Sequence, residues 1–216
     1  MRIAIFAAGG LGKVICDALK KDGSHDIVGF FDDKKKGKFF GYPILGKCGQ
    51  YQALCKRLNI QGLIVAFGYF FLDKRLSYYK KILNSKKLHL VNAVHPKAII
   101  SDDVKIGQGI YIGPGVIVNP GTRIGDNSVV WSGAIIEHDN IIARNVFITP
   151  GVKTAGYTKI GDNSFVGLAA NIAKSNIGKN VTVAAGSLVL SDIKSNSYVC
   201  GVPARTIKIK KRLAYV

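Results

Sequence analysis

Glu137, His138 and Asp139 are consecutive, so two carboxylates flank an imidazole. Histidine side chains have an unperturbed pKa of about 6.5 and can accept a proton at neutral pH. Either neighbouring carboxylate can bond one ring nitrogen and leave the other free to act as a base. The pattern favours proton transfer by a single base, and its alternative is a surface histidine in a polar turn.

Other catalytic chemistries have less support in the sequence. A serine hydrolase is not indicated, because the chain has no Gly-x-Ser-x-Gly motif. We expect no metal site, since His138 has no second histidine or cysteine cluster near it. His25, His89 and His95 carry no predicted role, and His95 precedes Pro96 at an expected domain boundary.

The segment around His138 belongs to a long repeat with an aliphatic residue at every sixth position. In phase from Ile100 the positions are Ile106, Ile112, Val118, Ile124, Val130, Ile136, Ile142, Ile148, Thr154, Ile160, Val166 and Ile172, followed one residue early by Ile177, Val183 and Val189. Only Thr154 is not aliphatic. A period of six fits neither a helix nor a simple strand. It predicts a parallel β-helix of roughly five coils, each burying its aliphatic residues against the next.

The N-terminal part has a different pattern. An apolar segment at residues 3–7 leads into Gly9, Gly10 and Gly12, and a helical spacing follows. Such a turn can bring the free N–H groups of a helix N-terminus to a phosphate. A second predicted strand, 27–31, ends in Asp32 and Asp33, which can accept hydrogen bonds from a ribose or base. The alternative is a turn with a structural role alone.

Further helices are predicted at 51–58 and 72–83, and strands at 63–67 and 88–91. Alternating strands and helices favour a small parallel sheet with ligands at the carboxyl ends of its strands. We therefore predict a Rossmann-like α/β domain at 1–93, an all-β helix of hexapeptide repeats at 94–194 and a C-terminal strand or tail at 195–216.

Composition limits where the protein works. The formal net charge is +18, but the lysines are scattered without interleaved aromatic residues, so we interpret them as solvated faces and a tail and expect no nucleic-acid partner. The four cysteines lack metal-ligand spacing, which favours free thiols in a reducing cytoplasm. No signal peptide or membrane span is visible. We expect a cytoplasmic protein that does not insert into a membrane.

Several motifs together resemble the sialic acid O-acetyltransferase and bacillosamine N-acetyltransferase group of sugar acetyltransferases. They are the glycine turn at 6–13, Phe31-Asp32-Asp33, the segment 42–46, His95-Pro96-Lys97-Ala98, the hexads, Glu137-His138-Asp139 and Gly201-Val202-Pro203-Ala204-Arg205. The resemblance covers nearly the whole chain. It implies a left-handed β-helix, a homotrimer with acetyl-CoA between neighbouring helices, and an N-terminal domain that binds a nucleotide-linked sugar.

The same resemblance implies residue roles. His138 matches the general base, Asp139 its acidic partner, and Gly156 the glycine whose N–H meets the thioester carbonyl. Gly167, Leu168, Ala185, Gly186, Pro203 and Arg205 fall at the CoA positions. Gly9, Gly10 and Gly12 would contact phosphate or sugar, and Asp32 and Asp33 the base. Leu11 departs from the family's pattern, since relatives often carry a histidine there.

The expected activity is transfer of an acetyl group from acetyl-CoA to the amine of a nucleotide-linked amino sugar during surface glycan (lipopolysaccharide or O-antigen) biosynthesis. Transfer would be direct, in a ternary complex. One alternative is O-acetylation of a sialic acid or another sugar hydroxyl, and another is a non-catalytic trimeric scaffold. Trp131, the only tryptophan, can stack on a sugar or CoA, or serve packing or a trimer interface.

Overall fold

The structure is a computed structural model that describes residues 1–208. The chain forms two compact units, and each has its own core. The first comprises Met1–Pro96 with Gln108–Ile110, and the second comprises 97–107 and the described chain from Tyr111 onward.

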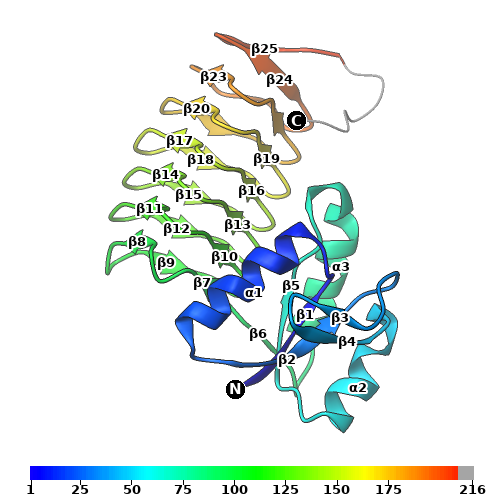
Figure 1. Cartoon of the computed structure of the whole chain (residues 1–216). Coiled ribbons are helices and arrows are strands. Elements are labelled where there is room, and N and C mark those ends of the chain that lie inside the picture. The colour runs from blue at the N-terminus through cyan, green and yellow to red at the C-terminus, as the bar shows by residue number, and fades with distance from the viewer. Residues whose placement is uncertain (209–216) are drawn as a thin grey trace. The chain divides into compact units, whose positions relative to one another are not determined.

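A six-stranded sheet with the order β3-β4-β2-β1-β5-β6 forms the centre of the first unit (Figure 1). Its strands are β1 Arg2–Phe6, β2 Asp26–Phe31, β3 Lys38–Phe39, β4 Tyr42–Gly46, β5 Gly62–Val65 and β6 His89–Leu90. Neighbours pair in parallel, except that β3 and β4 form an antiparallel hairpin. The sequence did not predict this hairpin, because its strands are largely half-buried or exposed and lack a continuous apolar run.

Three helices cover this sheet: α1 Gly10–Asp22, α2 Tyr51–Arg57 and α3 Leu72–Leu83. Short 3-10 turns precede the last two, at Cys48–Gln50 and Tyr69–Phe71. On one side of the sheet, Phe6 and Phe31 pack with Tyr51 of α2 and Ile82 of α3 in a single buried cluster. Because β1, β2 and β5 are parallel neighbours, their carboxyl ends meet at one edge.

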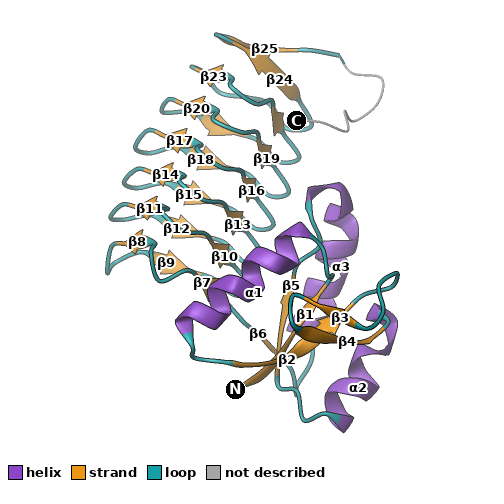
Figure 2. Cartoon of the chain, in the orientation of Figure 1, coloured by secondary structure: helices purple, strands orange, loops and turns teal. Residues whose placement is uncertain are grey.

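The second unit is a coil of short strands joined by short turns (Figure 2), and all its strands before β24 have two residues. One sheet contains β10 Tyr111–Ile112, β13 Val129–Val130, β16 Phe147–Ile148, β19 Phe165–Val166, β22 Thr182–Val183, β24 Tyr198–Gly201 and β25 Ala204–Thr206, whereas β7 Ala93–Val94 belongs to the first unit. The next contains β8 Ile99–Ile100, β11 Ile117–Val118, β14 Ile135–Ile136, β17 Lys153–Thr154, β20 Asn171–Ile172 and β23 Leu188–Val189. The third contains β9 Lys105–Ile106, β12 Arg123–Ile124, β15 Ile141–Ile142, β18 Lys159–Ile160 and β21 Asn176–Ile177.

The hexad residue is the second residue of each two-residue strand, and its side chain fills the shaft. Ile136, Ile142 and Ile148 are at most 1% exposed. Every third strand along the chain joins the same sheet. Equivalent strands of successive coils therefore pair in parallel, as β12 and β15 do through Arg123 and Ile141. The period found in the sequence is thus the period of the buried shaft.

The one-residue slip in the hexads is a shortened corner. Four residues separate β17 from β18, whereas three, 173–175, separate β20 from β21. Strand pairing is unaffected, since Lys159 still pairs with Asn176 and Ile160 with Ile177. The missing residue is therefore absorbed within one turn.

The coils continue past Val189, the last predicted hexad position. Ile193 bridges to Ile177, and Val199 of β24 pairs with Val183. Strand β25 then turns back antiparallel to β24. Of the predicted tail at 195–216, residues 209–216 lie outside the described chain.

A ladder of asparagine side chains supports one corner of the coil. Asn127 Nδ2 donates to Asn145 Oδ1 at 2.8 Å, and Asn145 Nδ2 donates to Asn163 Oδ1 at 2.9 Å. All three have positive φ angles, between 56° and 59°. Asparagine tolerates this left-handed region better than most residues, so it suits both the turn and the ladder.

Candidate active site and binding pocket

His138 lies in the corner between β14 and β15. Its Nδ1 is 2.9 Å from Asp139 Oδ2, which favours the tautomer with a proton on Nδ1. Asp139 has a φ of 55°, so the chain turns sharply at the residue that supplies the carboxylate. Within the described chain Nε2 has no hydrogen-bond partner, and the ring is about half exposed, with a side-chain exposure of 48%. This nitrogen is therefore available to a substrate.

Gly156 occupies the matching corner one coil further on, between β17 and β18. A Cβ atom on Gly156 would lie 2.5 Å from His138 Nε2, so only glycine lets the ring keep this position. The Gly156 N–H donates to no acceptor in the described chain. Tyr157 bounds the ring on one side, with its centroid 5.1 Å from that of His138 and the planes at 89°. The structure thus brings His138, Asp139 and Gly156 together.

Thr154, the one non-aliphatic hexad residue, supports this corner. Elsewhere, the residue after a shaft position donates its N–H to the shaft carbonyl of the next coil, as Asn119 does to Ile136 at 2.9 Å and Ala155 to Ile172 at 2.8 Å. The Glu137 N–H instead contacts Thr154 Oγ1 at 3.3 Å. The break in the pattern therefore contacts the residue that directly precedes the candidate base.

The other residues predicted for CoA lie away from this corner: they follow β19, β22 or β24, except Arg205, which lies on β25. Leu168, Ala185, Gly186, Pro203 and Arg205 are exposed. Gly186 donates its N–H to the Leu168 carbonyl at 2.7 Å, so two adjacent rungs are joined. Gly167 has a packing role, because its Cβ would lie 2.5 Å from the Ala185 nitrogen of the next coil.

Trp131 is half-buried and packs on Tyr111. The ring centroids are 5.9 Å apart and the planes stand at 77°. This contact gives the tryptophan a packing role between two successive coils.

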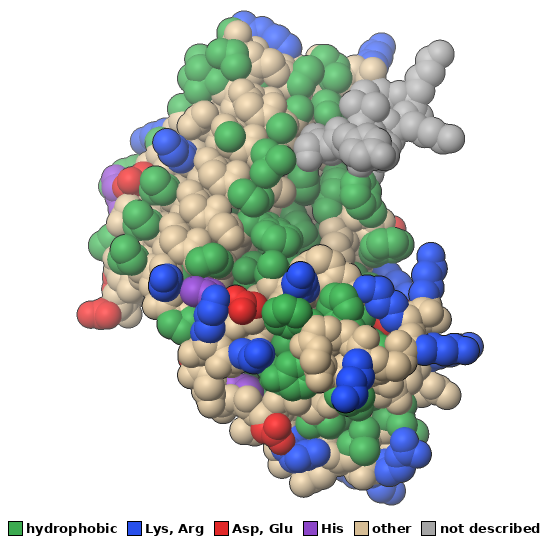
Figure 3. All heavy atoms as spheres, in the orientation of Figure 1, with side chains coloured by type: hydrophobic (Ala, Val, Ile, Leu, Met, Phe, Trp, Pro, Cys, Tyr) green, Lys and Arg blue, Asp and Glu red, His purple; other side chains and the backbone are tan. Residues whose placement is uncertain are grey.

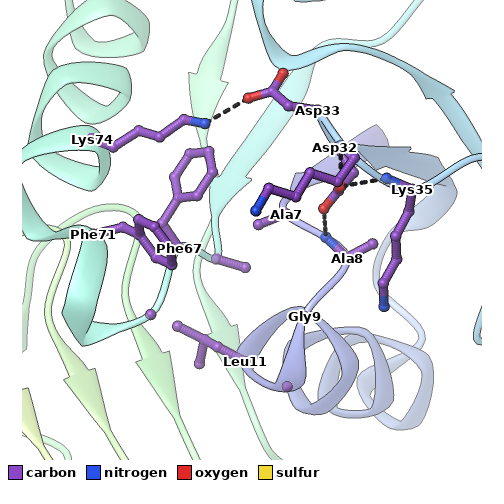
Figure 4. A pocket seen from close by; sticks show the side chains of 14 residues that line it. Ala7, Ala8, Gly9, Leu11, Asp32, Asp33, Lys35, Phe67, Phe71 and Lys74 are labelled. Atoms are coloured by element: carbon purple, nitrogen blue, oxygen red, sulfur yellow. Dashed lines mark hydrogen bonds and ion pairs between the residues drawn. The ribbon is translucent and has the colours of Figure 1, made fainter. Parts of the chain in front are cut away.

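A pocket of about 420 Å³ lies within the first unit, at the carboxyl edge of the sheet (Figure 4). Gly9, Gly10, Asp32, Asp33, Phe67 and Lys74 are among its lining residues. A Cβ at Gly9 or Gly10 would meet no atom within 4 Å, so nothing in the chain itself requires glycine there. Gly12 does not line the pocket, and its Cβ would lie 2.1 Å from the Ala7 oxygen. Gly12 therefore serves the close packing of α1 on β1.

The two aspartates are held by different partners. Asp32 accepts backbone N–H groups from Ala8 at 2.8 Å and from Lys34 and Lys35 at 2.9 Å each. Burial alone would raise the pKa of Asp32, but these three N–H groups together lower it. The Asp32 carboxylate thus stabilises the turns around the pocket through these three hydrogen bonds.

Asp33 pairs with a lysine. Its Oδ2 is 2.6 Å from Lys74 Nζ, and this bond to Lys74 lowers the pKa of Asp33. Asp33 Oδ1 also accepts the Cys48 N–H at 2.9 Å. Partial burial would lower the pKa of Lys74, yet the bond to Asp33 raises it overall. The pair joins α3 to the end of β2 across the pocket, as Figure 4 shows.

Sequence reasoning missed the second wall of this pocket. Phe67, Phe71 and Lys74 follow β5 or begin α3, and the Lys74 ammonium lies 4.7 Å from the centre of the Phe67 ring. The expectation that ligands bind at the ends of parallel strands pointed to this edge. Neither aromatics in a turn nor a helical lysine carries a distinctive motif, so their roles appear only in three dimensions.

All four cysteines are free. Among the described residues no cluster of three potential metal ligands occurs, and no described helix is long and apolar enough to cross a bilayer. On the face shown in Figure 3, Lys and Arg side chains are dispersed among other residue types.

Two family models match the sequence. The PglD N-terminal domain matches residues 2–82, and the bacterial transferase hexapeptide model, of six repeats, matches 103–138. No curated protein matches the chain at a significant level.

Solved structures match almost the whole chain. Perosamine N-acetyltransferase from Caulobacter crescentus, in complex with CoA and GDP-perosamine, is 27% identical, with a TM-score of 0.89 over 97% of this chain and 98% of that one. The acetyltransferase domain of PglB from Neisseria gonorrhoeae, in complex with acetyl coenzyme A, is 29% identical, with a TM-score of 0.86 over 95% and 98%. WeeI from Acinetobacter baumannii is 23% identical with a TM-score of 0.82 over 96% and 100%, and supports the fold.

The fold and these matches define a hexapeptide-repeat acyltransferase. The predicted fold class, an α/β domain followed by a left-handed parallel β-helix, is confirmed. The resemblance to sugar acetyltransferases read from the motifs is confirmed as well.

Proposed function

We propose that the protein transfers the acetyl group of acetyl-CoA to the amino group of a nucleotide-linked amino sugar used in surface glycan biosynthesis. The similarity to enzymes solved with CoA, acetyl-CoA or GDP-perosamine supports both substrates. One observation carries the assignment of the chemistry: His138 is paired with Asp139 through Nδ1, while its free Nε2 faces Gly156.

Transfer proceeds directly in a ternary complex. The amine nitrogen attacks the acetyl carbonyl carbon, and His138 Nε2 takes the proton that the nitrogen loses. The Gly156 N–H stabilises the oxyanion, and the carbon–sulfur bond then breaks to release CoA, whose thiolate receives from His138 the proton that the amine lost. General base catalysis contributes about 10²–10⁴-fold, and one oxyanion donor about 10²–10³-fold.

The pocket of the first unit binds the nucleotide. Gly9 and Gly10 begin α1, where free N–H groups and the helix dipole favour a phosphate. The open space at both glycines lets a ligand approach the backbone closely. In this proposal Asp33 contacts the base or ribose, while Asp32, which is bonded to three N–H groups, holds the turn. Gly12 supports this turn from behind.

CoA lies along the corner formed by Gly167, Leu168, Ala185 and Gly186, with Pro203 and Arg205 at its end. This corner follows β19, β22 and β24, whereas His138 follows β14. A homotrimer, in which a corner of one protomer meets a different corner of its neighbour, accounts for a site made of both. Three active sites would then lie between protomers.

The test is acetyl transfer from acetyl-CoA to a panel of UDP-, GDP- and dTDP-linked amino sugars, with sialic acid as a hydroxyl acceptor. We expect one amino sugar to be acetylated and His138→Ala to lower kcat by about 10²-fold or more. His89→Ala, an exposed histidine on β6, is the matched control and should leave kcat unchanged.

Acetylation of sialic acid alone would replace the amine acceptor with a hydroxyl. If the chain binds no acetyl-CoA and acetylates no acceptor, it is a scaffold, and the proposed function is wrong.

A further inference from the structure

Asn140 ends the corner that begins at Glu137, and its side chain is fully buried. Its Nδ2 lies within hydrogen-bond distance of three backbone carbonyls: Glu137 at 2.6 Å, His138 at 3.1 Å and Ala155 at 3.0 Å. An amide nitrogen has only two protons, so at least one proton is shared between two acceptors. One side chain thus contacts both the corner of the base and the corner of the oxyanion glycine.

The orientation of this amide is fixed by its surroundings. If the nitrogen and oxygen were exchanged, Oδ1 would face three carbonyl oxygens and gain no donor. In the orientation present, Oδ1 is buried and has no hydrogen-bond partner in the described chain. A buried acceptor without a donor is unfavourable, so the arrangement needs a compensating gain.

In the neighbouring coils, a threonine hydroxyl is the donor at the position that Asn140 occupies here. Thr122 donates to the Glu137 carbonyl at 2.9 Å, and Thr158 donates to the Ala173 carbonyl at 3.2 Å, in each case to the next coil. The Asn140 bond to Ala155 is the equivalent bond. The coil therefore requires only one donor here, and the two contacts to Glu137 and His138 are additional. Asn140 departs from the hydroxyl used in the neighbouring coils and leaves its own buried Oδ1 without a donor in the described chain. Such an unfavourable departure is expected at a functional position.

The bond to Ala155 has a consequence at the next residue. The Ala155 carbonyl and the Gly156 N–H belong to one planar trans peptide and point in opposite directions. Holding the carbonyl on Asn140 therefore fixes the direction of the Gly156 N–H, which has no acceptor of its own in the described chain. The same amide group holds the His138 carbonyl, and so the backbone that carries the imidazole.

We propose that Asn140 is a positioning residue that sets the oxyanion-binding N–H of Gly156 and the base His138 in register with each other. This inference rests on the proposed function. Asn140 contacts no substrate, and its effect is on the chemical step, because both groups it orients act in the transition state.

The test is Asn140→Thr, which copies Thr122 and Thr158 and keeps one donor for Ala155 while it removes the bonds to Glu137 and His138. We expect kcat to fall about 10- to 100-fold, with the KM for acetyl-CoA within about threefold of the wild type and Tm little changed. The matched control, Thr158→Val, removes one buried bond from the next coil and should leave kcat within about threefold.

A kcat for Asn140→Thr within about threefold of the wild type, or a loss of kcat matched by the same loss in Thr158→Val, would overturn the inference. Asn140→Ser, with a smaller hydroxyl, serves as the second variant if the threonine does not fit. If neither folds, the coil itself requires the amide and the inference is wrong.

His138→Ala is measured in the same assay. If that variant retains full kcat, the proposed function fails; if it loses activity while Asn140→Thr does not, only the present inference fails.

Discussion

The Cα of Gly156 faces the His138 ring so closely that a Cβ would lie 2.5 Å from Nε2 and 2.6 Å from Cε1. The neighbour is a side chain that can rotate away, not a fixed backbone atom. Gly156→Ala should therefore displace the imidazole and lower kcat about 10²-fold or more with little change in Tm.

Gly161→Ala is the contrasting variant. Its Cβ would lie 2.7 Å from the carbonyl carbon of Gly178, which cannot move without disturbing the coil. Overpacking of this kind costs about 1–3 kcal/mol, so Tm should fall by several degrees. Equal losses of Tm in the two variants, measured by calorimetry, would contradict this distinction.

Thr154→Val removes the hydroxyl that accepts the Glu137 N–H and restores an aliphatic residue to the shaft. We expect kcat to fall roughly tenfold, because the corner that carries His138 relaxes, while the free energy of unfolding changes by less than about 1 kcal/mol. Thr149→Val removes a comparable bond, to the Val166 carbonyl, and is the control. Similar kcat values for the two variants would refute a role for Thr154 at the active site.

Gly9→Ala and Gly12→Ala separate binding from folding. A Cβ at Gly9 is free of contacts, so the first variant should fold normally but bind the nucleotide-linked sugar at least about tenfold more weakly. A Cβ at Gly12 would lie 2.1 Å from the Ala7 oxygen, so the second should lose about 1–3 kcal/mol of stability. Calorimetric titration and thermal unfolding check the two outcomes. Normal sugar affinity in Gly9→Ala would remove the glycine turn from the binding site.

The Asp33 and Lys74 pair predicts a dependence of stability on pH. The pKa of Asp33 is lowered below 3.8 in the folded chain, chiefly by its bond to Lys74, so the folded state favours the carboxylate. The stabilisation is present above pH 3.8 and is lost as the pH falls through the lower, folded pKa.

Asp33→Asn should therefore lower Tm at pH 7, and its difference from the wild type should shrink below pH 3.8. Asp17→Asn removes an exposed pair with Lys21 and should have a smaller effect at pH 7. A difference that stays constant between pH 7 and pH 3 would show that the charge of Asp33 contributes nothing.

The β-helix could be predicted from the repeat, because every shaft position is buried in the same way. An aliphatic residue at every sixth position is the direct sign of that burial. Val199 and Ile193 belong to the same coils but escaped prediction, because shortened corners displace them from the six-residue phase. The β3 and β4 hairpin was missed for a different reason, since half-buried strands without an apolar run resemble loops.

For the site, the flanking acids of His138 were visible in the sequence, whereas its supports were not. Asn140 bonds the Ala155 carbonyl of the next coil, and Thr154 accepts the Glu137 N–H of the preceding coil, and no local sequence pattern reports contacts between coils. Asp32 is an example of a residue whose type and position in the sequence indicated a ligand contact. In the structure, three backbone N–H groups already bind its carboxylate.

The shortened corner at 173–175 bears on how this chain can change length. A residue is missing there, yet Lys159 and Asn176 remain paired, and so do all later rungs. Insertions and deletions at corners therefore leave the shaft intact, whereas a change of one residue within a strand would exchange its inner and outer side chains. Equivalent positions in such chains are found by counting rungs, not residues.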